Sequence, residues 1–270
     1  MTIHFTKYHG TGNDFILIDN RNWLFPKSEE NVRFLCNRRF GIGADGLILL
    51  EGSQNSGFSM VYYNSDGGES TFCGNGGRCF VAFAFQLGLI SNFPNFEFTA
   101  KDGPHQARMD GNLIHLKMKD VPQVGLSNFN FVLDTGSPHY VKWVESLDTM
   151  DVRKEGVLIR NSPPFAERGI NVNFIERREG RICVRTFERG VEDETLSCGT
   201  GVTASALVAA MNGFSSPVQV ETLGGNLEVR FEHKLFSYSN IWLVGPAKAV
   251  FEGQFDRNEL PNPVAGANGF

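Results

Sequence analysis

Alternating apolar and polar residues recur in short segments along the chain, and this period is typical of half-buried strands in antiparallel sheets. Helical periodicity is less frequent. The pattern predicts strands over residues 15–19, 46–50, 59–63, 96–99, 113–118, 131–135, 172–175, 181–187, 218–222, 227–231 and 241–244. The fold is therefore expected to be rich in sheet.

Four segments are predicted to be helical. Ser28 is a suitable N-cap for the first, which extends to about Arg39, because two glutamates follow it and Gly41 lies just past its end. The other helices are expected over residues 74–87, 199–211 and about 135–149. Helices are therefore the minority element in this chain.

Two segments of the chain resemble each other. Residues 69–84 read ESTFCGNGGRCFVAFA, and residues 194–209 read ETLSCGTGVTASALVA. In both, a glutamate precedes a cysteine by four residues, Gly-x-Gly follows the cysteine, and an apolar helix comes next. Glu69 and Glu194 are interpreted as stabilisers of the loop or helix start. The chain therefore contains two copies of one strand–loop–Cys–helix unit, with a boundary expected near residues 119–125.

Composition excludes several classes of protein. The 270 residues carry a net charge of −5, whereas nonspecific nucleic-acid binding needs a surplus of Lys and Arg. No apolar run reaches the ~18 residues of a membrane span, and the first residues lack a secretory signal. The five cysteines are an odd number, which favours free thiols in a reducing compartment. A cytoplasmic protein without membrane or nucleic-acid partners is expected.

The repeated cysteines, Cys73 and Cys198, precede predicted helices directly. Helix N-termini stabilise anions, so a thiol placed there has an enhanced thiolate fraction. The N–H groups that follow, those of Gly74, Asn75, Gly199 and Thr200, are expected to bind a carboxylate. Cys36, Cys79 and Cys183 lack the repeated frame and are interpreted as core residues.

Several kinds of chemistry use paired thiols. A metal site needs further ligands at closer spacing, which the sequence does not offer. A structural disulfide is not expected in the cytoplasm, and a single nucleophile leaves the second cysteine unexplained. Inversion of a carbon centre fits best, because one thiolate removes a proton from one face while the other thiol delivers a proton to the opposite face.

Further motifs accompany the two cysteine segments along the chain. The full set is KYHGTGNDF (7–15), FGIGADGL (40–47), YNSDG (63–67), CGNGGRC (73–79), GSPH (136–139), GINVNF (169–174), FERG (187–190) and CGTG (198–201). With these motifs the sequence resembles the diaminopimelate epimerase family, whose members are pyridoxal-phosphate-independent amino-acid epimerases. The resemblance extends to about Phe255.

The resemblance implies a mixed α/β fold with α+β character. Two pseudo-symmetric domains are expected, each a barrel-like, mostly antiparallel sheet around a central helix. The first domain covers residues 1–119 with a returning segment at 249–260, the second covers residues 120–248, and residues 261–270 form a mobile tail.

The resemblance also implies roles for individual residues. Cys73 and Cys198 become the acid–base pair, and His139 and Glu188 the pair that tunes the thiols. Substrate binding is implied for Asn13, Gly46, Asn64, Gly74, Asn75, Ser137, Asn171, Glu188, Arg189, Gly199 and Thr200. Gly46 and Ser137 stand where many family members have Gln and Asn. A homodimer, with Phe251 near the dimer contact, and a reaction without cofactor or metal are implied.

The sequence leaves two alternatives to diaminopimelate epimerisation in lysine biosynthesis. The first is an epimerase or racemase of another amino acid, such as proline or hydroxyproline, which also uses two cysteines. A proline enzyme has no need of Asn64, Asn171 and Arg189 together for a second zwitterionic end. A binding protein or redox sensor with a switchable disulfide is the other alternative. Proton exchange at a substrate α-carbon distinguishes the epimerase from the sensor.

Overall fold

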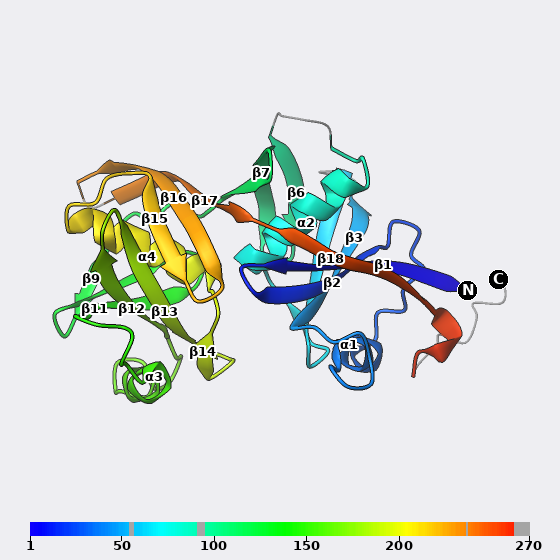
Figure 1. The fold of residues 1–270 in the computed structure, drawn as a ribbon, viewed down its shortest axis with the longest axis horizontal. Coiled ribbons are helices and arrows are strands. Elements are labelled where there is room, and N and C mark those ends of the chain that lie inside the picture. Colours follow the sequence, from blue (N-terminus) through cyan, green and yellow to red (C-terminus); the bar gives the residue numbers. More distant parts are fainter. Residues whose placement is uncertain (54–56, 91–94, 236, 262–270) are drawn as a thin grey trace. The chain divides into compact units, whose positions relative to one another are not determined.

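The computed structural model describes residues 1–53, 57–90, 95–235 and 237–261. The chain divides into two compact units, the first formed by Met1–Ile114 with the segment from Ala247 onward, and the second by His115–Pro246 (Figure 1). Of the tail predicted at residues 261–270, only Pro261 lies within the described residues. The predicted class, a mixed α and β fold dominated by strands, is confirmed.

Unit 1 wraps a curved sheet around one helix. Its elements are β1 (Thr2–Gly10), β2 (Asn13–Asp19), α1 (Glu29–Cys36), β3 (Gly46–Ser53), β4 (Gly57–Asn64), β5 (Glu69–Ser70), α2 (Gly74–Gln86), β6 (Phe96–Ala100), β7 (Gly103–Asp110), the start of β8 (Leu113–Lys117), β18 (Lys248–Asp256) and η1 (Arg257–Glu259). The main strands pair in the order β18–β1–β2–β3–β4–β6–β7. Because α2 contacts β1, β2, β3, β4 and β7, the sheet curves around this helix.

Unit 2 repeats this plan. Its elements are β9 (Gly125–Ser127), β10 (Asn130–Asp134), β11 (Pro138–Trp143), α3 (Val152–Arg160), β12 (Asn171–Arg178), β13 (Arg181–Glu188), β14 (Asp193–Thr195), α4 (Gly199–Met211), β15 (Val218–Thr222), β16 (Gly225–Lys234) and β17 (Ser237–Pro246). The pairing runs β9–β10–β11–β12–β13–β15–β16–β17, and β8 joins β17. The central helix is α4, which contacts β10 to β13 and β15 to β17.

The two central helices are apolar on nearly all sides, which suits a helix enclosed by a sheet. Residues 74–84 of α2 are all buried, and so are most residues of α4 up to Ala209. A second helix covers the outer face of each sheet: α1 packs on β2 and β3, and α3 packs on β12 and β13. Strands covered on both faces have continuous apolar runs, such as Leu47–Leu50 of β3.

The helix predicted over residues 135–149 is wrong. Residues Pro138–Trp143 instead form β11, which pairs with β10 on one side and with β12 on the other. Its β-branched and aromatic residues favour the two-sided strand environment over a helix. The helix in this region starts later, at Val152, where the Asp151 side chain accepts a hydrogen bond from the Lys154 N–H.

Two other differences concern the end of the first helix and several strands that were not predicted. The first helix ends at Cys36 instead of about Arg39, because the Asn37 side chain accepts hydrogen bonds from the N–H groups of Arg39 and Phe40 and forms a turn. Strands β1 and β7 and the short β5, β9 and β14 were not predicted, and β18 was expected only as the segment that returns at residues 249–260.

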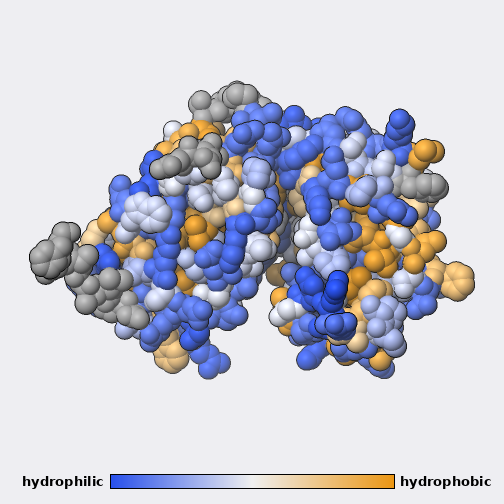
Figure 2. Space-filling view, turned by 180° about the vertical axis from the view of Figure 1, so that it is seen from behind, coloured by the Kyte–Doolittle hydropathy of each residue, from blue (hydrophilic) through white to orange (hydrophobic). Residues whose placement is uncertain are grey.

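One face of the protein is mainly polar. Figure 2 shows hydrophilic residues over much of one face, with hydrophobic residues gathered in smaller areas between them. Among the described residues, no helix combines the length and the hydropathy that crossing a membrane requires.

Candidate functional site

Each central helix begins immediately after one of the repeated cysteines. Cys73 is the N-cap of α2 and Cys198 is the N-cap of α4, both with extended backbone. Neither side chain forms a capping hydrogen bond to its helix. The first N–H groups of a helix have no acceptor within the helix, so both starts can bind an anion through backbone donors.

The second glycine of each Cys-Gly-x-Gly motif lets the helix lie close to the sheet. A Cβ on Gly76 would lie 3.0 Å from Ile48 Cδ1, and one on Gly201 would lie 2.3 Å from Asn173 Oδ1. The motif thus has a packing function in addition to exposing backbone N–H groups.

In unit 1, Asn13 and Asn75 lie next to the Cys73 thiol. Cys73 Sγ donates to Asn13 Oδ1 at 3.6 Å, and Asn75 Nδ2 donates to the same oxygen at 3.4 Å. The Arg78 guanidinium, completely buried, donates to Asn75 Oδ1 at 2.9 Å and to Thr11 Oγ1 at 3.0 Å. The structure therefore brings three of the predicted site residues together.

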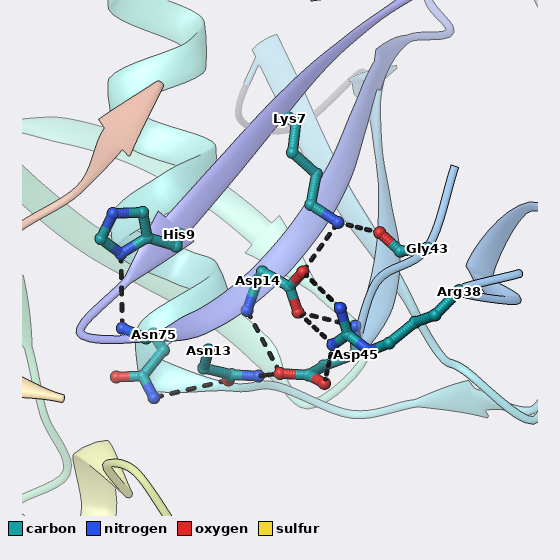
Figure 3. A network of polar contacts seen from close by, with 9 residues as sticks. Lys7, His9, Asn13, Asp14, Arg38, Gly43, Asp45 and Asn75 are labelled. Atoms are coloured by element: carbon teal, nitrogen blue, oxygen red, sulfur yellow. Dashed lines mark hydrogen bonds and ion pairs between the residues drawn. The ribbon is translucent and has the colours of Figure 1, made fainter. Parts of the chain in front are cut away.

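A charged network holds Asn13 from the other side (Figure 3). Asn13 Nδ2 donates to Asp45 Oδ2 at 2.7 Å, and Arg38 donates to both Asp45 and Asp14 at 2.7 Å. Lys7 pairs with Asp14 at 2.8 Å. Burial alone would raise the pKa of Asp14, but the hydrogen bonds from Arg38 and Lys7 hold it well below its usual range.

This network determines which way the Asn13 amide faces. A carboxylate only accepts hydrogen bonds, so the amide nitrogen must point to Asp45 and the amide oxygen to Cys73. Two cations and two carboxylates balance the charge of the network. Asn13 is thereby oriented before any ligand arrives.

Gly46 and Asn64 lie opposite each other in the β3–β4 ladder, and Asn64 is exposed at the end of its strand. A Cβ on Gly46 would lie 2.6 Å from the Tyr63 carbonyl oxygen and 2.7 Å from Tyr62 Cε2. This backbone therefore accepts no side chain at position 46, and a glutamine there would require the strand to move.

In unit 2, Thr200 lies beside the Cys198 thiol, with 3.4 Å between Sγ and Oγ1. The turn between β10 and β11 packs on this helix start, since Thr135 Oγ1 donates to the Thr200 carbonyl at 2.9 Å. Ser137 lies in this turn, where its carbonyl accepts from the Thr135 N–H at 3.2 Å.

Asn171 ties the end of β12 to its neighbours. Its amide nitrogen donates to the Pro138 carbonyl at 3.1 Å, and its oxygen accepts from the Arg189 backbone N–H at 2.9 Å. The Arg189 guanidinium donates to the Arg168 carbonyl at 3.1 Å. Glu188 ends β13 and is half-buried. Asn171 thus positions the backbone that bears Arg189.

His139 is completely buried and uncharged at neutral pH. Burial, with the nearby Arg189 charge, lowers the pKa of His139 to about 3. The ring is on strand β11 and not at a helix start. The other cysteines, Cys36, Cys79 and Cys183, are buried, and burial raises the pKa of each thiol.

Comparison with known proteins gives the family. The sequence profile of the family described as diaminopimelate epimerase matches residues 5–121 and 131–249. The chain belongs to the diaminopimelate epimerase family. The resemblance drawn from the sequence motifs is thereby confirmed.

Relatives of this family cover nearly the whole chain. The diaminopimelate epimerase of Flavobacterium psychrophilum is 50% identical over 251 residues, which is 91% of this chain and 97% of that protein. That of Chlorobaculum tepidum is 46% identical over 255 residues, 90% of this chain and 98% of the relative.

Solved structures at low identity share the fold of this epimerase family member. A phenazine biosynthesis protein of the PhzF family from Bacillus anthracis has a TM-score of 0.73 at 15% identity and covers 95% of this chain and 99% of its own. A hydroxyproline epimerase from Agrobacterium vitis has a TM-score of 0.66 at 14% identity and covers 94% and 92%. At this identity the likeness concerns the fold alone.

Sequence reasoning missed several supporting residues: Thr11, Asp45, Arg78, Thr135 and Asn173. One signal was available. Thr11-Gly12-Asn13 and Thr135-Gly136-Ser137 are matching turns, both with glycine at positive φ, and each turn lies against the start of a central helix. The internal repeat therefore extends to these turns, and Ser137 is the counterpart of Asn13.

Proposed function

We propose that this protein is a diaminopimelate epimerase, which interconverts the LL and meso forms of 2,6-diaminopimelate and supplies the meso form for lysine biosynthesis. The observation that carries the proposal is the pair of N-cap cysteines, Cys73 and Cys198, each at the start of a buried helix in one of two similar units. Family membership over most of the chain supports the substrate.

The proposed step exchanges a proton at the substrate α-carbon. The thiolate of one cysteine takes the α-proton and becomes a thiol, while the electron pair left on carbon is delocalised into the adjacent carboxylate. The thiol of the other cysteine then gives its proton to the opposite face and becomes a thiolate. Protons and charge balance, and the reverse reaction exchanges the two roles.

Backbone donors are proposed to bind the reacting carboxylate. The N–H groups at the starts of α2 and α4, from Gly74 and Asn75 and from Gly199 and Thr200, are oriented before the reaction. Such donors stabilise negative charge as it develops on the carboxylate, which lowers the barrier to proton removal.

The distal amino-acid end of the substrate is assigned to Asn64, Glu188 and Arg189, whose side chains offer donors and acceptors suited to a zwitterion. Arg189 would contact the distal carboxylate. Asn171 contributes by holding the Arg189 backbone, because both ends of its amide are engaged within the protein.

We also infer a homodimer and a cytoplasmic location. Strand β18 pairs with β1, and it carries the exposed Val250 and Phe251. Exposed apolar side chains on such a strand are suited to contact with a second copy. The proposed chemistry needs reduced thiols, which the cytoplasm maintains.

Proton NMR in deuterated buffer tests the reaction directly. Reduced protein is incubated with LL-diaminopimelate, and meso product with deuterium at the α-carbon is expected. Exchange with proline or hydroxyproline but not with diaminopimelate would replace the proposed substrate. Absence of exchange with every amino acid tested, with thiols shown to be reduced, would refute an epimerase and favour a sensor.

Alanine variants test the two-thiol step. Cys73→Ala and Cys198→Ala are each expected to lose epimerisation while circular dichroism stays unchanged. Cys183→Ala is the matched control, because that cysteine lies in the middle of β13, in the core cluster that includes residues of α3, and it should keep activity. Full activity in either N-cap variant would contradict the mechanism.

A further inference from the structure

Three polar side chains form a buried row across neighbouring strands of unit 2. Asn173 on β12 lies directly opposite Thr186 on β13, and it is two residues from Asn171, the ladder partner of His139 on β11. Asn173 and His139 are completely buried, and Thr186 nearly so. The row lies on the face covered by α4, because the Asn173 amide occupies the space beside Gly201 in the first turn of that helix.

A backbone carbonyl determines the orientation of the Asn173 amide. Asn173 Nδ2 lies 3.1 Å from the Tyr140 carbonyl oxygen, and Asn173 Oδ1 accepts from Thr186 Oγ1 at 3.0 Å. A carbonyl oxygen only accepts hydrogen bonds, so the amide nitrogen must face Tyr140. The opposite orientation would place two oxygens against each other.

The amide in turn determines the tautomer of His139. Asn173 Nδ2 also lies 3.1 Å from His139 Nδ1. Since Nδ2 is a donor, Nδ1 must be the unprotonated nitrogen of the ring, and a neutral imidazole then carries its proton on Nε2.

The other ring nitrogen of His139, Nε2, is buried. Among the described residues it forms no hydrogen bond. A buried donor without an acceptor is unfavourable and calls for an explanation. The low pKa of His139 agrees with a ring that stays neutral and keeps this donor.

We propose that Asn173 is a positioning residue of the epimerase: it holds His139 as a neutral Nε2–H donor, so that His139 supplies a fixed hydrogen bond to the reacting site and carries no proton between groups. This inference rests on the proposed function for its catalytic part. On this proposal His139 acts through its N–H group and not through a positive charge, because the ring stays neutral.

The first test is ¹⁵N NMR of the histidine rings in the intact protein. His139 is assigned by the signal that disappears in His139→Gln. Wild-type His139 is expected to show an acceptor-type Nδ1 and a protonated Nε2 at neutral pH and down to about pH 5, where ordinary histidines are charged. A protonated Nδ1 or an imidazolium in this range would overturn the proposal.

Asn173→Asp is the second test. A carboxylate beside Nδ1 only accepts, so the proton is expected to appear on Nδ1, with kcat lower by about tenfold or more, the size expected when a hydrogen bond to a charged group is lost. An unchanged Nε2–H tautomer would refute the orienting role of Asn173. A shifted proton with unchanged kcat would refute its role in the reaction.

Thr186→Val is the matched control in the same row. It removes the hydroxyl donor to Asn173 Oδ1 and leaves the Tyr140 carbonyl to orient the amide, so the Nε2–H tautomer is expected to persist. The wild-type ¹⁵N spectrum tests the predicted tautomer even if neither variant folds. The tautomer is measured without substrate, so the two parts of the proposal can fail separately. If the Nε2–H tautomer is confirmed but the protein does not epimerise diaminopimelate, the proposed function and the catalytic role are refuted. The orienting role of Asn173 is then still supported.

Discussion

Replacing His139 with glutamine is expected to change how the stability of the protein depends on pH. The native ring is completely buried, and burial together with the Arg189 charge lowers its pKa from 6.5 to about 3. In the unfolded chain the ring is solvated and has its ordinary pKa. Between these two values the unfolded chain binds a proton that the native protein does not bind.

The sign and size of the effect follow from this difference. Above pH 6.5 both states are neutral, and His139 contributes no pH dependence. As the pH falls below 6.5, protonation favours the unfolded chain, so the free energy of unfolding falls by about 1.4 kcal/mol per pH unit until about pH 3. At about pH 4.5 the loss amounts to roughly 3 kcal/mol.

Urea unfolding of wild type and His139→Gln at about pH 7.5 and pH 4.5 measures this loss. Glutamine retains an N–H donor but does not titrate, and all other groups are common to both proteins. Wild type is expected to lose about 3 kcal/mol more than the variant between the two pH values. An equal loss in both proteins would show that the native ring binds a proton and would refute the reasoning.

Three further predictions concern packing and the thiol site. Gly46→Ala places a Cβ about 2.6 Å from the Tyr63 carbonyl, so the free energy of unfolding should fall by about 1–3 kcal/mol in urea, and unchanged stability would contradict the tight fit. Gly156→Ala places a Cβ 2.4 Å from both Cβ and Cγ of Phe187 and should cost a similar amount, and unchanged stability would contradict this close packing. Asp45→Ala frees the Asn13 amide, so kcat should fall about tenfold with little change in Tm. Asp19→Asn, at the other end of the strand that begins with Asn13, should match wild type. Equal rates in Asp45→Ala and wild type would show that Asp45 does not orient the site.

Local pattern was enough wherever neighbours along the chain decide the structure. The N-cap at Ser28, the strands with clear alternation and the two apolar helices after Cys73 and Cys198 all appear as expected. The helix predicted over segment 135–149 was wrong, because pairing on both sides makes β11 a strand: β11 lies between β10, which directly precedes it, and β12, which begins only at Asn171. Strand β18 has little burial of its own and is formed by its pairing with β1.

The candidate site likewise has one part that the sequence predicted and one part that it did not. The repeated cysteine motifs, their glycines and the family could be recognised from the sequence, because helix starts and close approaches leave local signatures. The supporting contacts could not. Asp45 is 32 residues from Asn13, and Asn173 is 34 residues from His139, and in each case the sheet brings the pair together.

The sequence by itself thus determined the two-unit plan, the position of each thiol at a helix start and the class of chemistry, since these depend on residue type and near-neighbour spacing. Only the tertiary structure decided the state of each partner group: the direction of the Asn13 amide, the neutral His139 ring and the internal engagement of Asn171. The charge of a side chain and the direction of its hydrogen bonds depend on burial and on contacts between strands that are distant in sequence. A short segment of sequence predicts neither.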